Sequence, residues 1–310
     1  MLLRHLHTDR YRFVAATLVL LAVATYGCNR SPSSSLTKNR EVVDESGRRV
    51  SLPARIDRIV SLAPNLTEIV YAVGAGDQLV GDTTYCDYPA AAKSVEKIGD
   101  TLHPSLERII ALRPQIVLVS TASQLEAFTG QLEAHNISVY VTDPRDLEGV
   151  FRSIEQLGEI LGRSDQAKSV VKQLRERTAN VERAVKSQLP IRVFYQLSAE
   201  PLYTAGHDAF VTDLIKRAGA ISVTIDVPGA WPRYSAESAM AARPDAIILP
   251  TGGSMGEANS TVAAALTGSP AVTNGRVYKI NDDHLVRPGP RAVNGLEELA
   301  RALHPNAIGK

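Results

Sequence analysis

The stretch from Asp146 to Leu189, DLEGVFRSIEQLGEILGRSDQAKSVVKQLRERTANVERAVKSQL, is the longest helical pattern in the chain, and it lies between two halves that resemble each other. Its apolar side chains recur in steps of three and four, which places them on one stripe of a helix. That stripe runs through Val150, Ile154, Leu157, Leu161, Ala167, Val170, Val171, Leu174, Thr178, Val181 and Val185. Gly162 suits the residue after a helix and Ser164 suits an N-cap, so the pattern predicts two consecutive helices. Pro190 ends the second helix, which would be about 35 Å long from 165 to 188.

Such a helix suits either the surface of a single α/β domain or a rigid spine between two lobes, and the flanking sequence decides between them. Short β-branched runs alternate with helical patterns on both sides, which indicates βαβ units and largely parallel sheets. Before the spine we expect strands at 58–62, 79–81, 115–120 and 137–141, and helices at 65–73 (capped by Asn65 or Thr67), 105–112 and 123–135. After it we expect strands at 192–197, 245–249 and 277–280, and helices at 210–218, 235–242, 262–266 and 292–303.

The two halves also resemble each other residue by residue. TEIV at 67–70 matches TDLI at 212–215, and each is followed by Gly-Ala. SLERIIALRPQIVLV at 105–119 matches SAESAMAARPDAIIL at 235–249, with Glu107 and Glu237 each seven residues before a proline. The matches keep the same order on both sides of the spine, which favours a repeat over chance similarity.

We therefore predict an α/β fold of two similar lobes with mainly parallel central sheets, joined by one long spine helix, with a ligand cleft between the lobes. The predicted organisation is an N-terminal lobe at 41–146, a connecting helical spine at 147–189 and a C-terminal lobe at 190–310. Because open α/β sheets bind ligands at the carboxyl ends of their strands, the strand-end loops are the places to look for a site.

The first residues have the pattern of a targeting segment, which we place at 1–27. A short basic stretch precedes FVAATLVLLAVAT at 13–25, a signal-peptide core that is too short to span a bilayer permanently. The segment ends at Gly27-Cys28, like a bacterial lipoprotein processing site, although Thr25 leaves ordinary secretion as the alternative. The Ser-rich stretch that completes 28–40 is a flexible tether. We expect a protein of the periplasm or the outer face of the envelope, anchored to a membrane only through a lipid on Cys28.

Composition and motifs exclude several functions. The formal net charge of +1 gives no electrostatic basis for nucleic-acid binding. The sequence contains no GxSxG, HExxH, CxxC or phosphate-loop motif, and the histidines lack metal-ligand spacing. Cys86, the only other cysteine, is expected to be a half-buried structural residue. We therefore expect no catalytic residue, no bound metal and no resident cofactor.

Aromatic residues in strand-end loops are the candidates for ligand binding. Tyr85 and Tyr88 lie in YCDYP at 85–89, and Tyr203 follows the first strand of the second half. Trp231, the only tryptophan, lies in the Pro-rich loop VPGAWPRYS. A core-anchoring role for Trp231 is the alternative, but a platform for a flat apolar ligand is favoured, because aromatic rings bring large contact area at low entropic cost.

YCDYP, SLERIIALRP, the TAG turn at 204–206 and AWPRYSAE at 230–237 together resemble the helical-backbone (class III) substrate-binding proteins of ABC importers. The resemblance covers about 41–304 and is nearest to the cobalamin-binding type. It implies that Tyr85 and Trp231 contact the corrin ring and that Glu107 and Glu237 dock onto arginines of a permease dimer. On this basis the predicted ligand residues are Tyr85, Trp231, Tyr203, Leu197 and Arg287, and the predicted protein is a monomer that delivers cobalamin to the importer.

The sequence departs from the cobalamin type at several positions, which keeps other ligands open. Thr101 and Ser120 stand where further tryptophans are expected, and Val286 where an acidic ligand contact is expected. Arg287 and Arg291 would suit the carboxylates of haem or of a ferric siderophore, the alternatives within the same class. A periplasmic hydrolase using Asp87 or His284 and a ligand sensor are the alternatives from other classes.

Overall fold

The computed structural model describes residues 39–121, 126–252 and 261–308. From Asn39 onward the chain forms one compact unit. The predicted signal segment and Cys28 lie outside the described residues. Among the helices of the described part, none combines the length and the apolar character that crossing a membrane requires.

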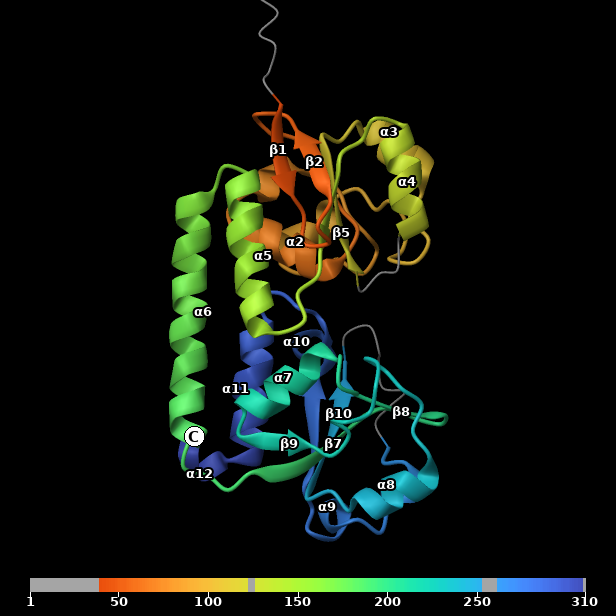
Figure 1. Cartoon of the computed structure of the whole chain (residues 1–310), viewed down its shortest axis with the longest axis vertical. Helices are drawn as coiled ribbons and strands as arrows, with labels where there is room; N and C mark the ends of the chain where they lie inside the picture. Colours follow the sequence, from red (N-terminus) through yellow and green to blue (C-terminus); the bar gives the residue numbers. More distant parts are fainter. Residues whose placement is uncertain (1–38, 122–125, 253–260, 309–310) are drawn as a thin grey trace, which may run out of the picture. The chain divides into compact units, whose positions relative to one another are not determined.

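The N-terminal half is built on a four-stranded sheet in the order β4-β3-β5-β6, in which every neighbouring pair is parallel. The strands are β3 (Ile59–Ser61), β4 (Leu79–Gly81), β5 (Ile116–Ser120) and β6 (Val139–Thr142), and β3 and β5 are buried along their whole length. The accompanying helices are α2 (Pro64–Ala72), α3 (Leu106–Leu112) and α4 (Glu126–Ala134), and Figure 1 shows α3 and α4 beside β5. The continuous apolar runs of these strands are those of a parallel sheet covered on both faces.

The predicted cap of α2 is wrong. Ala63 is the N-cap and Pro64 occupies the first turn, where its missing N–H costs nothing. Thr67 instead donates to the Ser61 hydroxyl at 2.9 Å, and Asn65 donates to the carbonyl of Pro288 at 3.3 Å. These two polar residues therefore hold α2 against neighbouring segments rather than starting it.

An antiparallel hairpin that the sequence did not indicate opens the described chain. It pairs β1 (Arg40–Val43) with β2 (Arg49–Leu52). Its turn is closed by Asp44, whose Oδ1 accepts from the backbone N–H of Arg48 at 2.8 Å. Only Val50 and Leu52 of the hairpin are buried hydrophobic residues, so its apolar signal is too short to stand out in the sequence.

The C-terminal half repeats the arrangement in the order β11-β10-β7-β8, with β9 also paired to β7. Its strands are β7 (Ile191–Ala199), β8 (Leu202–Thr204), β9 (Ala220–Ser222), β10 (Ala246–Thr251) and β11 (Val277–Asn281), and all pairs are parallel except β7 with β8. Its helices are α7 (Phe210–Arg217), α8 (Ala236–Ala242), α9 (Pro270–Thr273), α10 (Asp282–Val286), α11 (Ala292–Leu303) and α12 (Pro305–Ile308). The mainly parallel sheets of both halves confirm the predicted fold class. The helix expected at 262–266 is only a short 3-10 turn, η4 (Ala264–Leu266).

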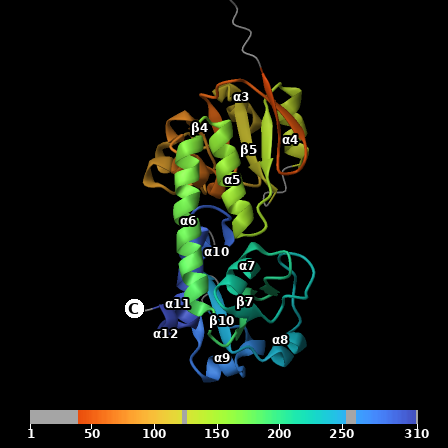
Figure 2. The same ribbon diagram turned by 60° about the vertical axis from the view of Figure 1, so that its left-hand side comes forward.

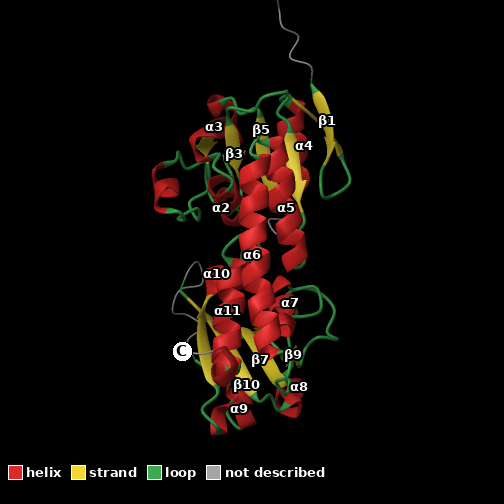
Figure 3. Cartoon of the chain, turned by 90° about the vertical axis from the view of Figure 1, so that its left-hand side faces the viewer, coloured by secondary structure: helices red, strands yellow, loops and turns green. Residues whose placement is uncertain are grey.

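The spine consists of α5 (Leu147–Ile160) and α6 (Ser164–Val185), which pack side by side. Figures 2 and 3 show α6 running alongside both α5 and α11, so it contacts elements of both halves. At 22 residues α6 is about 33 Å long. Gly162 has the positive φ of +69° expected after a helix, but the N-cap of α6 is Arg163, and Ser164 is the first helical residue.

One apolar core continues through the spine from half to half. Leu157 and Ile160 of α5 and Val171, Leu174 and Val181 of α6 belong to the same buried cluster as residues of both sheets. Two smaller clusters lie within single halves, one around Ile109 and Val117 and the other around Phe194 and Ile247. Because the shared core continues from one half into the other, the lobes are tied together by packing as well as by the chain.

Candidate functional site

The helices α3 and α8, which carry the predicted docking residues, have the same local structure. Each spans seven residues and begins after a serine whose side chain accepts a backbone N–H, Ser105 from Arg108 and Ser235 from Ser238. Glu107 and Glu237 each occupy the second helical position, and both are exposed. An acid in the first turn is stabilised by the partial positive charge of the helix N-terminus.

The same helices are anchored to their sheets by equivalent contacts. Arg58 donates from Nε to the carbonyl of Leu112, the last residue of α3, at 2.9 Å, and Arg192 donates to the carbonyl of Ala242, the last residue of α8, at 2.8 Å. The sequence repeat therefore corresponds to a structural repeat, which includes equivalent individual hydrogen bonds. It presents two equivalent exposed carboxylates, one from each half.

The loop that carries Tyr85 and Tyr88 follows β4, at the carboxyl end of the parallel sheet. Both tyrosines are exposed, by 46% and 48% respectively. Between them Cys86 is buried, with Sγ at 3.2 Å from the hydroxyls of Thr67 and Thr83. Burial, partly offset by these two hydroxyls, raises the pKa of the Cys86 thiol. Cys86 is thus a structural residue, as expected, but fully rather than half buried.

Lys97 holds this loop in place through three hydrogen bonds. Its ammonium group donates to the carbonyls of Cys86 and Ala92 at 3.0 and 2.9 Å and to Oδ1 of Asp82 at 2.7 Å. Asp82 is completely buried, and the loss of water raises its pKa to about 6 even though Lys97 favours the charged form. The exposed tyrosines are therefore held on a rigid base.

Trp231 lies in the Pro-rich loop 227–235, between β9 and α8. Its side chain is 37% exposed, and its ring is tilted at 43° to that of Tyr195, with 5.9 Å between the ring centroids. Gly206 packs beneath the loop so closely that a Cβ there would come within 2.3 Å of the carbonyl oxygen of Gly229. The backbone of Tyr203 in β8 forms an isolated antiparallel β-bridge with Arg233 of the same loop. Trp231 thus packs against a buried residue and stays partly accessible.

A cluster of charged side chains joins the two halves next to the loop 85–89. Arg291 donates to Glu68 through two bonds, Nε to Oε2 at 3.0 Å and Nη2 to Oε1 at 2.7 Å, and its guanidinium lies 4.3 Å from the centre of the Tyr88 ring. Arg287 forms ion pairs with Asp283 at 2.8 Å and with Asp87 at 3.1 Å. Glu68 is buried, which raises its pKa although both arginines favour the charged form.

Most of this cluster could not be predicted from the sequence, because its members lie far apart in the chain. Arg287 and Arg291 were expected to be available for ligand carboxylates, but both are already paired, and the Arg287 side chain is only 8% exposed. Glu68 and Asp283 were not singled out. Asp87 accepts from Arg287 at 3.1 Å, and His284 is hydrogen-bonded to Glu298 at 2.9 Å.

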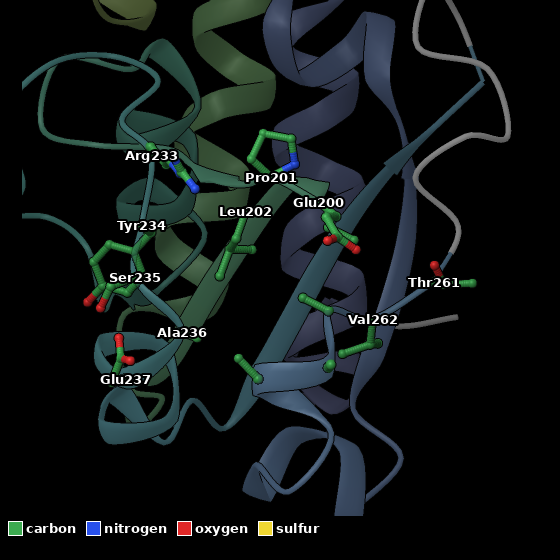
Figure 4. A pocket seen from close by; sticks show the side chains of 14 residues that line it. Glu200, Pro201, Leu202, Arg233, Tyr234, Ser235, Ala236, Glu237, Thr261 and Val262 are labelled. Atoms are coloured by element: carbon green, nitrogen blue, oxygen red, sulfur yellow. The ribbon is translucent and has the colours of Figure 1, made fainter.

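A surface pocket of about 820 Å³ lies beside α8 and is lined in part by Arg233, Tyr234 and Ser235, which end the loop that carries Trp231. Figure 4 shows Glu237 at the start of α8 on one side of it and Glu200 and Thr261 on another. The pocket is lined by Glu237 but by none of the predicted ligand residues. Leu197, which is half-buried in β7, and Arg287 also lie outside it, so the ligand contacts remain a prediction. Within the described ranges, no group of three or more His, Cys, Asp or Glu side chains is arranged to hold a metal ion.

Two α/β lobes on a helical spine, with exposed aromatic rings in their strand-end loops, define a two-lobed solute-binding protein. The sequence from 59 to 284 matches the periplasmic binding protein family, and the chain belongs to that family. It is 31% identical to the uncharacterized ABC transporter substrate-binding lipoprotein YvrC of Bacillus subtilis, over 94% of this chain and 97% of that protein. It is 32% identical to a vitamin B12-binding protein of Vibrio vulnificus, over 81% of this chain and 91% of the relative.

Solved structures agree with this assignment. The periplasmic vitamin B12 binding protein BtuF of Vibrio cholerae superposes with a TM-score of 0.72 at 27% identity, covering 80% of this chain and 96% of that one. A periplasmic heme binding protein from Pseudomonas aeruginosa superposes with a TM-score of 0.71 at 26% identity, covering 81% and 94%. The chain is therefore a substrate-binding protein of the ABC-importer type and not an enzyme.

Proposed function

We propose that this protein captures cobalamin outside the cytoplasmic membrane and delivers it, as a monomer, to the permease dimer of an ABC importer. The observation that carries the proposal is the set of exposed rings, Tyr85, Tyr88 and Trp231, in strand-end loops of a two-lobed binding protein. A corrin is a broad, largely apolar macrocycle, and stacking on such rings is the contact it offers. The vitamin B12-binding relatives support the same choice.

Charge near the loops favours a corrin over haem or a carboxylate siderophore. The two arginines of the interlobe cluster face three carboxylates, those of Glu68, Asp87 and Asp283, so the cluster has no positive charge to spare. Haem carries two propionates that need cationic or hydrogen-bonding partners, whereas the corrin periphery carries mainly neutral amides. Binding a dianion here would require breaking buried ion pairs, which is costly.

Haem is nevertheless the second candidate, because a heme binding protein is among the solved structures of similar fold and identity. Calorimetric titration of the purified protein with cyanocobalamin, haemin and a ferric siderophore separates the candidates. We expect tight binding of cyanocobalamin alone. Tight binding of haemin without cyanocobalamin would replace the ligand and leave the receptor class in place.

Membrane attachment through Cys28 is part of the proposal. Its basis is the signal-type segment ending at Gly27-Cys28, the Ser-rich stretch after it, and the relative named as a lipoprotein. Cys28→Ser should release the protein from the membrane fraction while its melting temperature stays the same. Continued partition of this variant with membranes would contradict the lipid anchor.

A further inference from the structure

Two acids at equivalent positions of the repeat reach across to the other half. Glu68 in α2 and Asp213 in α7 follow the matching threonines Thr67 and Thr212. Glu68 holds Arg291, the residue that precedes α11, at 2.7 and 3.0 Å. Asp213 accepts the backbone N–H of Leu147, the first residue of α5, through Oδ2 at 3.0 Å. Each half thus places one carboxylate at the start of a long helix that follows the other half's sheet.

The two contacts differ in what surrounds them. Asp213 also accepts from Arg217 of its own helix at 2.8 Å, and Arg217 in turn binds Glu182 of α6 at 2.6 Å. None of these residues belongs to a loop that carries the exposed aromatic rings. The Asp213 contact therefore joins the halves without reaching the proposed ligand site.

The Glu68 contact, in contrast, reaches the site loop directly. The guanidinium that binds Glu68 lies over the ring of Tyr88, and the adjacent Arg287 binds both Asp283 and Asp87. Tyr88 and Asp87 both belong to the loop 85–89. Because a bidentate arginine–carboxylate pair allows little rotation, the position of Arg291 and of the ring above it is set by Glu68.

Close packing supports the same placement. Asn65, one turn before Glu68, donates to the carbonyl of Pro288, and a Cβ added at Gly289 would come within 3.3 Å of the Asn65 side chain. The segment between Arg287 and Arg291 thus lies directly on the start of α2. Glu68 and Asp283 are 3% and 5% exposed, so water competes little for the arginines.

We propose that Glu68 is a positioning residue for the ligand site: through Arg291 it fixes the loop 85–89 against the C-terminal half before any ligand binds. Asp213 is its structural counterpart and holds the halves together without affecting the site. The ligand arm of the test rests on the proposed function, so a second measurement that needs no ligand accompanies it.

The experiment compares Glu68→Gln with the matched control Asp213→Asn in otherwise intact protein. Affinity for cyanocobalamin is measured by calorimetry, and backbone hydrogen exchange over 84–92 is measured without ligand, where Cys86 N–H donates to the carbonyl of Thr83 at 3.0 Å. We expect Glu68→Gln to weaken binding about tenfold and to speed exchange of this segment at least tenfold. Asp213→Asn should lower the melting temperature while changing affinity and loop exchange less than twofold.

Arg291→Lys provides a second route if Glu68→Gln does not fold, since it keeps the charge but loses the bidentate geometry. Arg291→Lys should also weaken cyanocobalamin binding and speed hydrogen exchange over 84–92, each by a smaller factor than Glu68→Gln. Equal effects of the Glu68 and Asp213 variants, or unchanged loop exchange in Glu68→Gln or Arg291→Lys, would overturn the positioning role. If the unmutated protein does not bind cyanocobalamin, the proposed ligand fails, and hydrogen exchange alone still decides the role of Glu68.

Discussion

Arg113 and Arg243 end equivalent helices of the two halves in nearly the same left-handed conformation, with φ and ψ of 46° and 55° in one and 41° and 61° in the other. A non-glycine residue rarely adopts this conformation, so its occurrence at both positions reflects a constraint common to the two halves. In both, the next residue is a proline, which cannot continue the helix, and the chain turns directly into a buried strand. The constraint places Glu107 and Glu237 equivalently in their halves.

That equivalence leads to a prediction about docking. Glu107→Ala and Glu237→Ala should each impair cobalamin uptake by cells, and the double variant should impair it more than either single variant. Exposed ion pairs contribute about 1 kcal/mol or less each, so the two acids orient the complex more than they hold it. Glu176→Ala, which removes an exposed acid on α6, is the control and should leave uptake unchanged.

Ligand affinity of the isolated docking variants should equal that of the unmutated protein. Both acids are exposed on helices, and neither belongs to the loop 85–89 or to the loop 227–235 that carries Trp231. A weakened titration with cyanocobalamin would therefore move Glu107 or Glu237 into the ligand site and contradict a docking role.

The left-handed residues give a prediction about stability. Arg113→Gly should stabilise the protein by about 0.5–1 kcal/mol, because glycine adopts a positive φ without the steric cost that a Cβ brings. Thermal unfolding measures the change. Arg55→Gly, at an exposed position outside the helices and strands, is the control and should not stabilise. Destabilisation by Arg113→Gly would mean that contacts of the arginine side chain outweigh the backbone strain.

Periodicity predicted the fold because the elements that build the core have strong local patterns. The helix expected at 292–303 is α11 with the same bounds, and β4 was placed at its observed residues. The edge strands β8 and β9, of three residues each, were missed. Tertiary packing also overrode local chemistry at Asn65, where a good capping residue donates to the opposite half instead.

The candidate site was predictable only where a single residue type was informative by itself. Trp231 and Tyr85 stood out as large aromatic residues in loops rich in turn-forming residues. The partners of Arg291 could not be found in this way, since Glu68 lies 223 positions earlier in the chain, in α2. A single sequence gives no means of pairing residues at that separation, so Arg287 and Arg291 were interpreted as available cations.

Asp82 gives a prediction about pH. Its pKa in the folded protein, about 6, lies above the ordinary value of 3.8, chiefly because the carboxylate is buried. Between about pH 4 and pH 6 the folded state thus keeps a proton that the unfolded state has released, so this group's contribution to stability falls as pH rises. The full cost, on the order of 3 kcal/mol, is reached above pH 6.

Urea unfolding of the protein and of Asp82→Asn at pH 4.5 and pH 7.0 tests this. The free energy of unfolding of the unmutated protein, relative to Asp82→Asn, should fall between the two values. The asparagine cannot titrate and therefore serves as the reference for every other group. An increase in the relative stability at pH 7.0 would mean that the ion pair with Lys97 outweighs the cost of burying the charge.

The last prediction concerns Trp231, a residue that is 37% exposed and whose ring packs against that of the buried Tyr195. If its free face stacks on the ligand, Trp231→Ala should weaken cyanocobalamin binding by about 2 kcal/mol, or roughly thirtyfold in Kd. Trp231→Phe keeps an aromatic face and should lose much less. A residue that only anchors the core would instead cost about 3–5 kcal/mol of stability on truncation. Calorimetry together with thermal melting separates the two roles, and a large fall in melting temperature with unchanged affinity would make Trp231 structural.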